Sequence, residues 1–333
     1  MKTTQIVLLG LFVVLAIVAC QEENLDPDNK DDPKEEAIGS LSNFWYDQRT
    51  SKTQTFTVTS GSWSEIVGAE GTKITIYSNS FLRNGQPVSG NFQVDLIEVY
   101  DKGTMMTMGL NTMGLAPSGS LDAMVSGGEF YINATQNGQE LDINPSSPIQ
   151  VATAPFPDAD FNNDMMPLEL GIATTGGALG WIPNGTAPMS NCRDSSMIAL
   201  GQSTYCFQIG NNAQWTNCDY FNNTGTPLTD ITVKLPNIYD GNNASVMITF
   251  DGLNLVTDMY SGFSNDGSFF LSGTYQIPLG QDIHLVVIAE QNGNLVYHIQ
   301  SINVTNNQVV TLGPSDLINT TVANLQTQLS NLP

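Results

Sequence analysis

Basic side chains and histidine are scarce in this chain of 333 residues. Ten Lys and Arg residues stand against 32 Asp and Glu residues, which gives a formal net charge of −22 with neutral histidine. A surface with this charge repels phosphate groups, which excludes nucleic acid as a partner and disfavours adhesion to anionic lipid. The sequence also lacks Gly-x-Ser-x-Gly, Ser-x-x-Lys and His-Glu-x-x-His motifs, so we expect no enzymatic activity.

Cysteine is rare as well, with Cys20 near the N-terminus and three further residues, Cys192, Cys206 and Cys218. The last three are 14 and 12 residues apart, without a Cys-x-x-Cys pair, which disfavours a zinc site. In an oxidising compartment two of the three can pair, and sequence alone leaves three pairings open. We favour Cys192–Cys206, because this bond would close a loop-rich stretch and leave Cys218 within the following domain.

The chain begins with features of a secretory signal. Lys2 precedes an apolar run, Ile6 to Val18, which is shorter than the roughly 20 residues of a membrane span. Residues 1–19 therefore predict a cleavable signal peptide. The end of this run, Ile17-Val18-Ala19-Cys20, resembles the lipobox of bacterial lipoproteins, which implies that Cys20 is acylated and becomes the lipid-anchored N-terminus. The alternative is an ordinary signal peptide with an incidental cysteine.

An acidic segment follows Cys20. Residues 21–36 contain eight acidic and two basic side chains and almost nothing to bury, so we expect residues 20–50 to form a disordered tether. Gln21-Glu22-Glu23 resembles the surface-export signal of Bacteroidota lipoproteins, which implies an outer-membrane protein facing the cell exterior. A charged linker on a lipoprotein that faces the periplasm is the alternative.

The next segment, residues 51–182, alternates apolar and polar residues, as half-buried strands do. The alternation runs through Phe56 and Val58, Ile74 and Ile76, and Phe92 to Leu96, and Asn84-Gly85 and Asn137-Gly138 predict hairpin turns. We expect a β-sandwich. The runs Gly71-Thr72-Lys73-Ile74-Thr75-Ile76 and Ser126-Gly127-Gly128-Glu129-Phe130 resemble the ZU5-like β-sandwich domain, which implies an architectural or interaction role without a shared active site.

A loop-rich linker is predicted at residues 183–204, followed by a second β domain at residues 205–313. Short strands recur there, and Trp215-Thr216-Asn217-Cys218-Asp219 resembles a signature near the start of the second domain of similar lipoproteins. The strand spacing is typical of an immunoglobulin-like or fibronectin-like sandwich. Within residues 314–333, Ser315 and an apolar stripe that includes Leu325 and Leu329 predict a C-terminal helix. The predicted fold class is thus all-β, with two β-sandwiches in tandem.

One loop carries a possible cation site. Asp158, Asp160, Asn162 and Asp164, with Glu169 at the twelfth position, match the ligand spacing of a calcium loop. Asn163 stands where such loops have glycine, Pro167 lies inside the loop, and no flanking helices are evident. A solvated acidic loop between the domains is the alternative, and no other cofactor is expected.

Two functions are consistent with these features. The first is a non-enzymatic, lipid-anchored protein of the outer-membrane surface, acting as an adhesion, scaffold or interaction module with a protein or glycan ligand. The second is a carbohydrate-binding lipoprotein that captures glycans for an uptake system. Exposed aromatic residues would distinguish them, and the candidates are Trp63, Trp181, Trp215 and Tyr260. Aromatic rings side by side on one rim favour glycan capture, whereas buried rings favour a scaffold.

Overall fold

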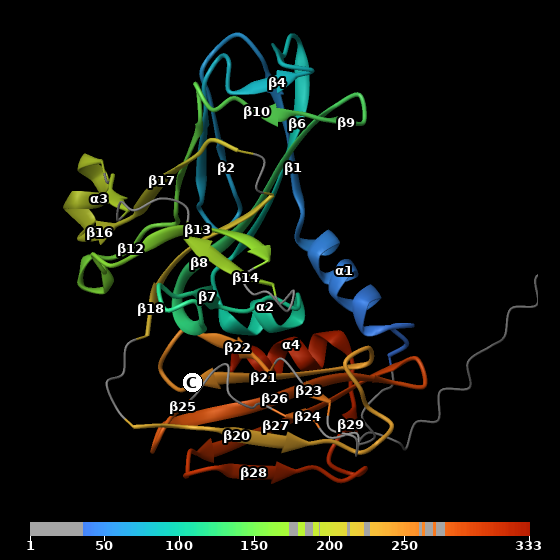
Figure 1. The fold of residues 1–333 in the computed structure, drawn as a ribbon. Helices are drawn as coiled ribbons and strands as arrows, with labels where there is room; N and C mark the ends of the chain where they lie inside the picture. The colour runs from blue at the N-terminus through green and yellow to red at the C-terminus, as the bar shows by residue number, and fades with distance from the viewer. Residues whose placement is uncertain are drawn as a thin grey trace, which may run out of the picture. The chain divides into compact units, whose positions relative to one another are not determined.

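A computed structural model of the protein describes residues 36–172, 179–183, 189–192, 194–211, 214–222, 227–259, 262–263, 269–270 and 277–333 (Figure 1). This part of the chain is mostly β, with several sheets and a short C-terminal helix, as the sequence predicts. The predicted signal peptide, Cys20, Gln21, Glu22 and Glu23 lie outside the described residues.

The largest sheet is organised around a long central strand, β8 (Leu121–Gln136). Its strand order is β1 (Gln54–Thr59), β6 (Asn91–Val99), β8, β18 (Trp215–Phe221), β13 (Met166–Ile172), β14 (Leu179–Pro183) and β7 (Met113–Leu115), and β9 (Gln139–Glu140) pairs with β8. Strand β7 pairs with both β14 and β8, so this sheet returns on itself.

A second sheet has five strands, in the order β15 (Ser190–Asn191), β17 (Tyr205–Ile209), β11 (Ile149–Ala152), β3 (Lys73–Ile76) and β2 (Ser64–Val67). Smaller pairings accompany it: β4 (Phe81–Arg83) with β5 (Gln86–Pro87) and β10 (Asp142–Ile143), and β12 (Phe156–Pro157) with β16 (Gln202–Ser203). A shared apolar core joins this sheet to the largest sheet, and it includes Ile74, Val94, Phe130, Val151 and Phe207. The predicted alternation of strand residues therefore supplies one buried face from each sheet.

The predicted boundary between two domains at residue 205 is wrong. Strand β17 pairs with β11, and β18 pairs with β8 and β13, so both belong to sheets built from the preceding segment. Residues 33–333 also form one compact unit. The alternating pattern identified the strands, but it does not indicate which sheet a strand joins, because pairing partners are selected by contacts far apart in sequence.

The C-terminal part of the chain builds another five-stranded sheet. Its order is β22 (Val256–Asp258), β21 (Ala244–Phe250), β26 (Asp282–Gln291), β27 (Asn294–Asn303) and β29 (Ile318–Asn319). Two-stranded pairings complete this part: β20 (Ile231–Lys234) with β28 (Gln308–Thr311), β19 (Leu228–Thr229) with β25 (Ile277–Pro278), and β23 (Gly262–Phe263) with β24 (Phe269–Phe270). An apolar core that includes Val233, Ile248, Leu285 and Val310 joins β20 and β28 to this sheet.

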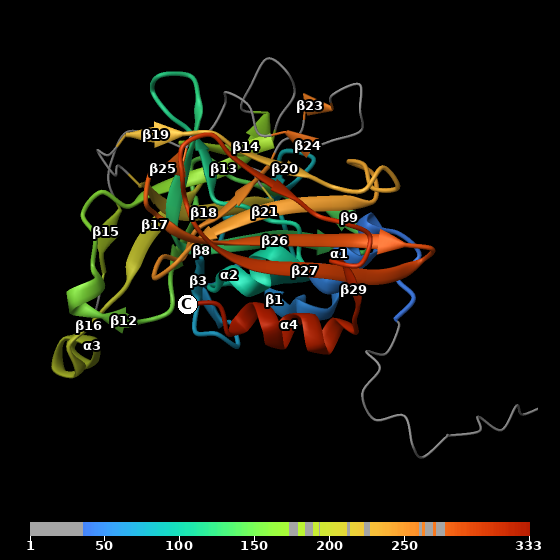
Figure 2. The ribbon, with the colours of Figure 1, turned by 90° about the horizontal axis from the view of Figure 1, so that it is seen from below.

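Three helices fill the space between the largest sheet and the C-terminal sheet (Figures 1 and 2). They are α1 (Leu41–Lys52), α2 (Lys102–Thr107) and α4 (Val322–Ser330), while α3 (Ser195–Leu200) lies elsewhere, next to β16. Their core joins Phe44, Met105 and Leu325 to Val99 of the largest sheet and Val286 of the C-terminal sheet. The two sheets are therefore connected through apolar helix faces.

The predicted tether is too long at its C-terminal end, because helix α1 begins at Leu41. The sequence predicts a disordered segment that includes residues 41–50, but these residues form most of α1, with Leu41 and Phe44 buried. The Ser40 side chain caps the helix by accepting a hydrogen bond from the backbone N–H of Asn43. The acidic composition ends before this point, and two apolar residues spaced three apart provide the buried face.

The predicted C-terminal helix is present but begins later than expected. Thr321 caps α4 by accepting from the backbone N–H of Asn324, whereas Ile318 and Asn319 form β29 and pair with β27. Hairpin turns follow the sequence more closely. Asn84-Gly85, Asn137-Gly138 and Asn292-Gly293 all have positive φ, the left-handed conformation that asparagine and glycine tolerate best.

Candidate functional site

The candidate site is a cleft of about 990 Å³. Its lining comes from β8, from the segment after β11, from β17 and β18, and from the turn before β22. The aromatic members are Tyr100, Phe156, Phe161, Tyr205 and Tyr220. Polar members include Glu70, Asp160, Asn162, Asp164 and Asn254. A volume at the upper end of the usual range for small-molecule sites, combined with apolar walls and a few polar groups, is typical of a ligand-binding cleft.

Three of the rings form a continuous wall. The ring centroids of Phe156 and Tyr205 are 4.7 Å apart, those of Phe161 and Tyr205 are 5.0 Å apart, and both pairs are stacked. Phe156 and Phe161 are nearly parallel, with an interplanar angle of 9°. Phe156 and Phe161 are half-buried, while Tyr205 is buried behind them. The wall therefore presents partly exposed ring surface that is held in place by a buried ring.

Hydrogen bonds fix the backbone on both sides of this wall. The Tyr205 hydroxyl accepts from the backbone N–H of Asn162 at 2.7 Å, which ties the acidic loop to β17. On the other side, the Tyr100 hydroxyl accepts from the backbone N–H of Ala154 at 2.7 Å and lies 2.6 Å from the Thr72 hydroxyl. Burial raises the pKa of Tyr100 and the pKa of Tyr205, so both hydroxyls stay protonated at neutral pH.

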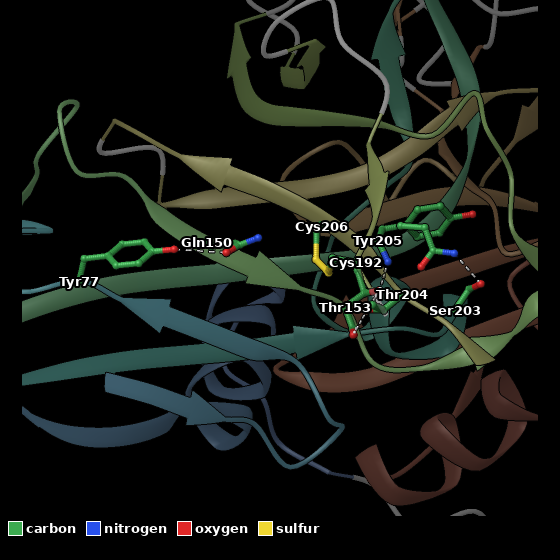
Figure 3. The surroundings of a disulfide bond; sticks show 9 residues. Tyr77, Gln150, Thr153, Cys192, Ser203, Thr204, Tyr205 and Cys206 are labelled. Atoms are coloured by element: carbon green, nitrogen blue, oxygen red, sulfur yellow. Dashed lines mark hydrogen bonds between the residues drawn. A yellow bond between two sulfur atoms is a disulfide. The ribbon is translucent and has the colours of Figure 1, made fainter. Parts of the chain in front are cut away.

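A disulfide bond supports the strand that carries Tyr205. Cys192 is joined to Cys206, the pairing that we favour from the sequence, and their Cα atoms are 5.9 Å apart (Figure 3). Cys218 is a free, buried thiol. Next to the bond, the Tyr205 backbone N–H donates to the Thr153 hydroxyl at 3.0 Å. Strand β17 is thus connected covalently to Cys192, directly after β15, and by a buried hydrogen bond to Thr153, directly after β11.

The five residues of the predicted calcium loop do not converge. Asp158 begins a short 3₁₀ turn (Asp158–Asp160) and accepts from the Ser203 hydroxyl at 2.6 Å. Asn162 accepts from the backbone N–H of Asp164, while Glu169 lies on β13 and accepts from the Asn211 amide at 2.6 Å. Among the described residues, no group of three or more His, Cys, Asp and Glu residues is arranged to hold a metal. The linear spacing matched a calcium loop, but β13 carries its twelfth position out of the loop.

The aromatic residues proposed from the sequence are dispersed. Trp181 is buried, with 1% of its surface exposed, and its indole N–H donates to the Asn111 carbonyl. Trp215 is half-buried beneath Arg49, whose guanidinium carbon lies 5.8 Å from the ring centroid. Trp63 is 60% exposed but does not line the cleft, and Tyr260 lies outside the described residues. These three tryptophans do not form a common rim.

Sequence reasoning missed the residues that form the cleft wall. One available signal was the group of aromatic residues close to turn-forming positions, Pro155-Phe156-Pro157 and Phe161, followed by the acidic loop. Tyr205 was visible only as a strand residue. Its contacts with Phe156 and Phe161 involve segments far apart in sequence, and β17 is held in its sheet by pairing with β11, which no local pattern indicates.

The cleft places acceptors beside apolar rings without a strong cationic group among its lining residues. Asp160 and Asp164 are exposed at its edge, and Asn162 and Asn254 contribute amide groups. The Asn254 side chain is partly used, because its amide nitrogen donates to the Tyr100 and Ser126 carbonyls. Such a lining suits a ligand with hydroxyl donors and an apolar face, and it disfavours phosphate or sulfate.

Comparisons with known proteins give no family assignment: no protein-family model matches the chain, and no curated protein matches it. Among the described residues, no helix is long and apolar enough to cross a membrane.

Proposed function

We propose that this protein is a non-enzymatic, lipid-anchored protein of the bacterial outer-membrane surface that binds glycans in the aromatic cleft. The observation that carries the proposal is the three-ring wall of Phe156, Phe161 and Tyr205 beside the acid and amide groups of the cleft. A sugar ring has an apolar C–H face and a rim of hydroxyl donors, so it can contact both kinds of surface at once.

The charge of the chain narrows the ligand class. A net charge of −22 and the acids Glu70, Asp160 and Asp164 at the cleft oppose binding of sulfated or uronic-acid glycans. We therefore infer that neutral oligosaccharides are the preferred ligands. We also propose that the ZU5-like and immunoglobulin-like resemblances describe the framework around the cleft, and that the chemistry lies in the cleft residues themselves.

A binding experiment with matched variants tests the cleft. Neutral oligosaccharides are titrated into the purified protein by calorimetry, beside sulfated forms of the same glycans. We expect measurable binding of a neutral glycan, and we expect Phe161→Ala to weaken it at least tenfold because a stacking surface is lost. Trp63→Ala is the control, since Trp63 is exposed but outside the cleft. Equal weakening by both variants, or no binding of any neutral glycan, would argue against the proposal.

The absence of catalysis is tested in the same samples. Bound oligosaccharide should be recovered intact after prolonged incubation, because the proposed role is capture. Release of new reducing ends by the wild-type protein, but not by Asp160→Asn or Asp164→Asn, would assign a hydrolytic role to the cleft acids instead.

The cellular location needs its own test. Cys20→Ser should release the protein from the membrane fraction, because the proposed lipid is attached there. Proteinase added to intact cells should digest the wild-type protein, whereas Glu22→Ala with Glu23→Ala should protect it by leaving it on the periplasmic face. Protection of the wild type in intact cells, with digestion after lysis, would reject surface exposure.

A scaffold or adhesion role has a separate observation in its favour. Helix α3 exposes Ile198 and Leu200, which are 56% and 72% accessible, next to the disulfide-linked strands. Leu200→Ser should then remove retention of a neighbouring surface protein in a crosslinking experiment while leaving glycan affinity unchanged. If Leu200→Ser changed neither the retention of a surface protein nor the glycan affinity, α3 would have no role in binding.

A further inference from the structure

A group of polar side chains is buried on the largest sheet, and none of its members lines the cleft, although Ser126, the strand partner of Asp219, does. Glu129 of β8 is paired directly with Asn217 of β18, and Asp219 follows two residues later on the same strand. All three residues have 0% of their surface exposed. Directly paired residues share a sheet face, as do residues two apart on one strand. We call Glu129, Asn217 and Asp219 the buried oxygen cluster.

Four side-chain oxygens of this cluster accept no hydrogen bond: both carboxylate oxygens of Glu129, Oδ1 of Asn217 and Oδ1 of Asp219. The Asn217 amide nitrogen donates to Asp219 Oδ2 at 2.7 Å, so the amide is oriented with its oxygen as the remaining acceptor. A buried acceptor without a donor costs about 1 to 3 kcal/mol, and charged groups cost more. Four such oxygens together indicate a missing positively charged partner.

Another buried carboxylate shows that the fold can supply donors. Glu98 of β6 is 5% exposed, and its oxygens accept from the Gln54 amide and from the backbone N–H groups of Glu70 and Thr72. No comparable donors reach Glu129 in the described part of the chain. The lack of donors is therefore specific to the surroundings of Glu129, because Glu98, on the neighbouring strand β6, has them.

Arg49 is the neighbouring cation, and its donors are directed elsewhere. Its guanidinium donates to the Met108 carbonyl at 2.8 Å and to the Gly109 carbonyl at 3.4 Å, and it lies over Trp215. Burial and the nearby Asp219 carboxyl raise the pKa of Glu129, Arg49 offsets this only in part, and no ion pair between Arg49 and Glu129 occurs among the described residues. Arg49 therefore donates no hydrogen bond to the four unpaired oxygens of the cluster.

We propose that the buried oxygen cluster binds one hard divalent cation, with calcium as the preferred ion. Two carboxylates balance its charge, and the Asn217 amide adds a neutral oxygen ligand, the combination that calcium takes in proteins. The free thiol of Cys218 belongs to the apolar core with Phe130 and Phe207, so it does not add a soft ligand to the oxygens. Because the oxygens are enclosed by the sheet and helices, the ion enters as the chain folds.

The test uses the full chain unfolded in chelator and refolded with calcium, with magnesium or without added metal. After passage through a metal-free column, elemental analysis should find one calcium per chain and a higher Tm than in the metal-free sample. Glu129→Gln and Asp219→Asn should each lose the bound ion. Glu98→Gln and Asp160→Asn are controls for a buried carboxylate with donors and for the exposed loop, and both should retain it.

A second measurement does not depend on variants that fold. Terbium refolded into the wild-type chain should emit on excitation of tryptophan, because Trp215 lies two residues from Asn217, and calcium should displace that emission. No retained metal and no terbium emission would overturn the proposal. It would also fail if Glu129→Gln and Asp219→Asn kept the ion, or if Asp160→Asn alone lost it.

Discussion

Two regions of this protein are rich in carboxylate and amide groups, and their oxygens have opposite surroundings. In the loop of residues 158–164, the side chains are exposed or accept hydrogen bonds from nearby residues such as Ser203. In the buried oxygen cluster, Glu129 and Asp219 are fully buried and retain oxygens without donors. Spacing along the chain suggested the first region as a cation site, whereas pairing between strands assembles the second.

The comparison shows why ligand spacing alone is a weak guide in a β protein. A calcium loop gathers oxygens because one continuous turn surrounds the ion. Here the residues after Asp164 continue into β13, so Glu169 leaves the loop. Residues 129 and 217 are far apart in sequence, but antiparallel register places them directly opposite each other. The chemistry of the second region therefore depends on the sheet.

The largest expected effect comes from removing a core ring beside the cluster. Phe130 is adjacent to Glu129 in sequence but belongs to the apolar core, and it is fully buried against Tyr100 and Phe207. Phe130→Ala should lower the free energy of unfolding by about 3 to 5 kcal/mol, because it leaves a cavity. Phe161→Ala, in the half-buried cleft wall, should cost about 1 kcal/mol through lost ring contacts. Urea unfolding followed by tryptophan fluorescence measures both.

If both variants lost the same free energy of unfolding, the cleft wall would be as sensitive to substitution as the core of the sheet. A smaller loss in the free energy of unfolding for Phe130→Ala than for Phe161→Ala would contradict the prediction. It would show that the cleft wall contributes more to stability than the core of the sheet.

Much of the local structure was predictable from the sequence. Alternation located β3 and β6, and Asn-Gly pairs located the turns, because these features depend on neighbouring residues. The assignment of β17 and β18 to the preceding sheets was not predictable, because strand pairing is decided by distant partners. The cleft wall has the same origin, since Tyr205 meets Phe156 and Phe161 only after β17 has joined its sheet.

A smaller effect should follow from removing the hydroxyl that ties the loop to the cleft wall. Tyr205→Phe keeps the stacked ring but loses the acceptor for the Asn162 N–H, so it should cost about 1 kcal/mol of stability. Hydrogen exchange at residues 162–164 should become faster. Tyr77→Phe is the control, because its exposed hydroxyl donates to Gln150 at 3.4 Å. Unchanged exchange in Tyr205→Phe would show that the loop is held by other contacts.

A pH-dependent effect concerns a third acidic residue, which tests desolvation without a cluster of unpaired oxygens. Asp258 lies on β22, and desolvation raises its pKa to about 7. An unfolded aspartate has a pKa of about 3.9, so between about pH 4 and pH 7 the folded chain holds a proton that the unfolded chain releases. This residue therefore makes the free energy of unfolding fall as the pH rises through that range.

Asp258→Asn should remove this contribution, so the Tm of the variant should fall less than that of the wild type between pH 4.5 and pH 8. Both proteins are measured in chelator, so that any bound cation does not change with pH. Asp160→Asn, which changes an exposed acid, should follow the wild-type curve. If Asp258→Asn had the wild-type slope while Glu129→Gln flattened it, the pH response would belong to the buried oxygen cluster, and burial of a single carboxylate would be too weak to produce it.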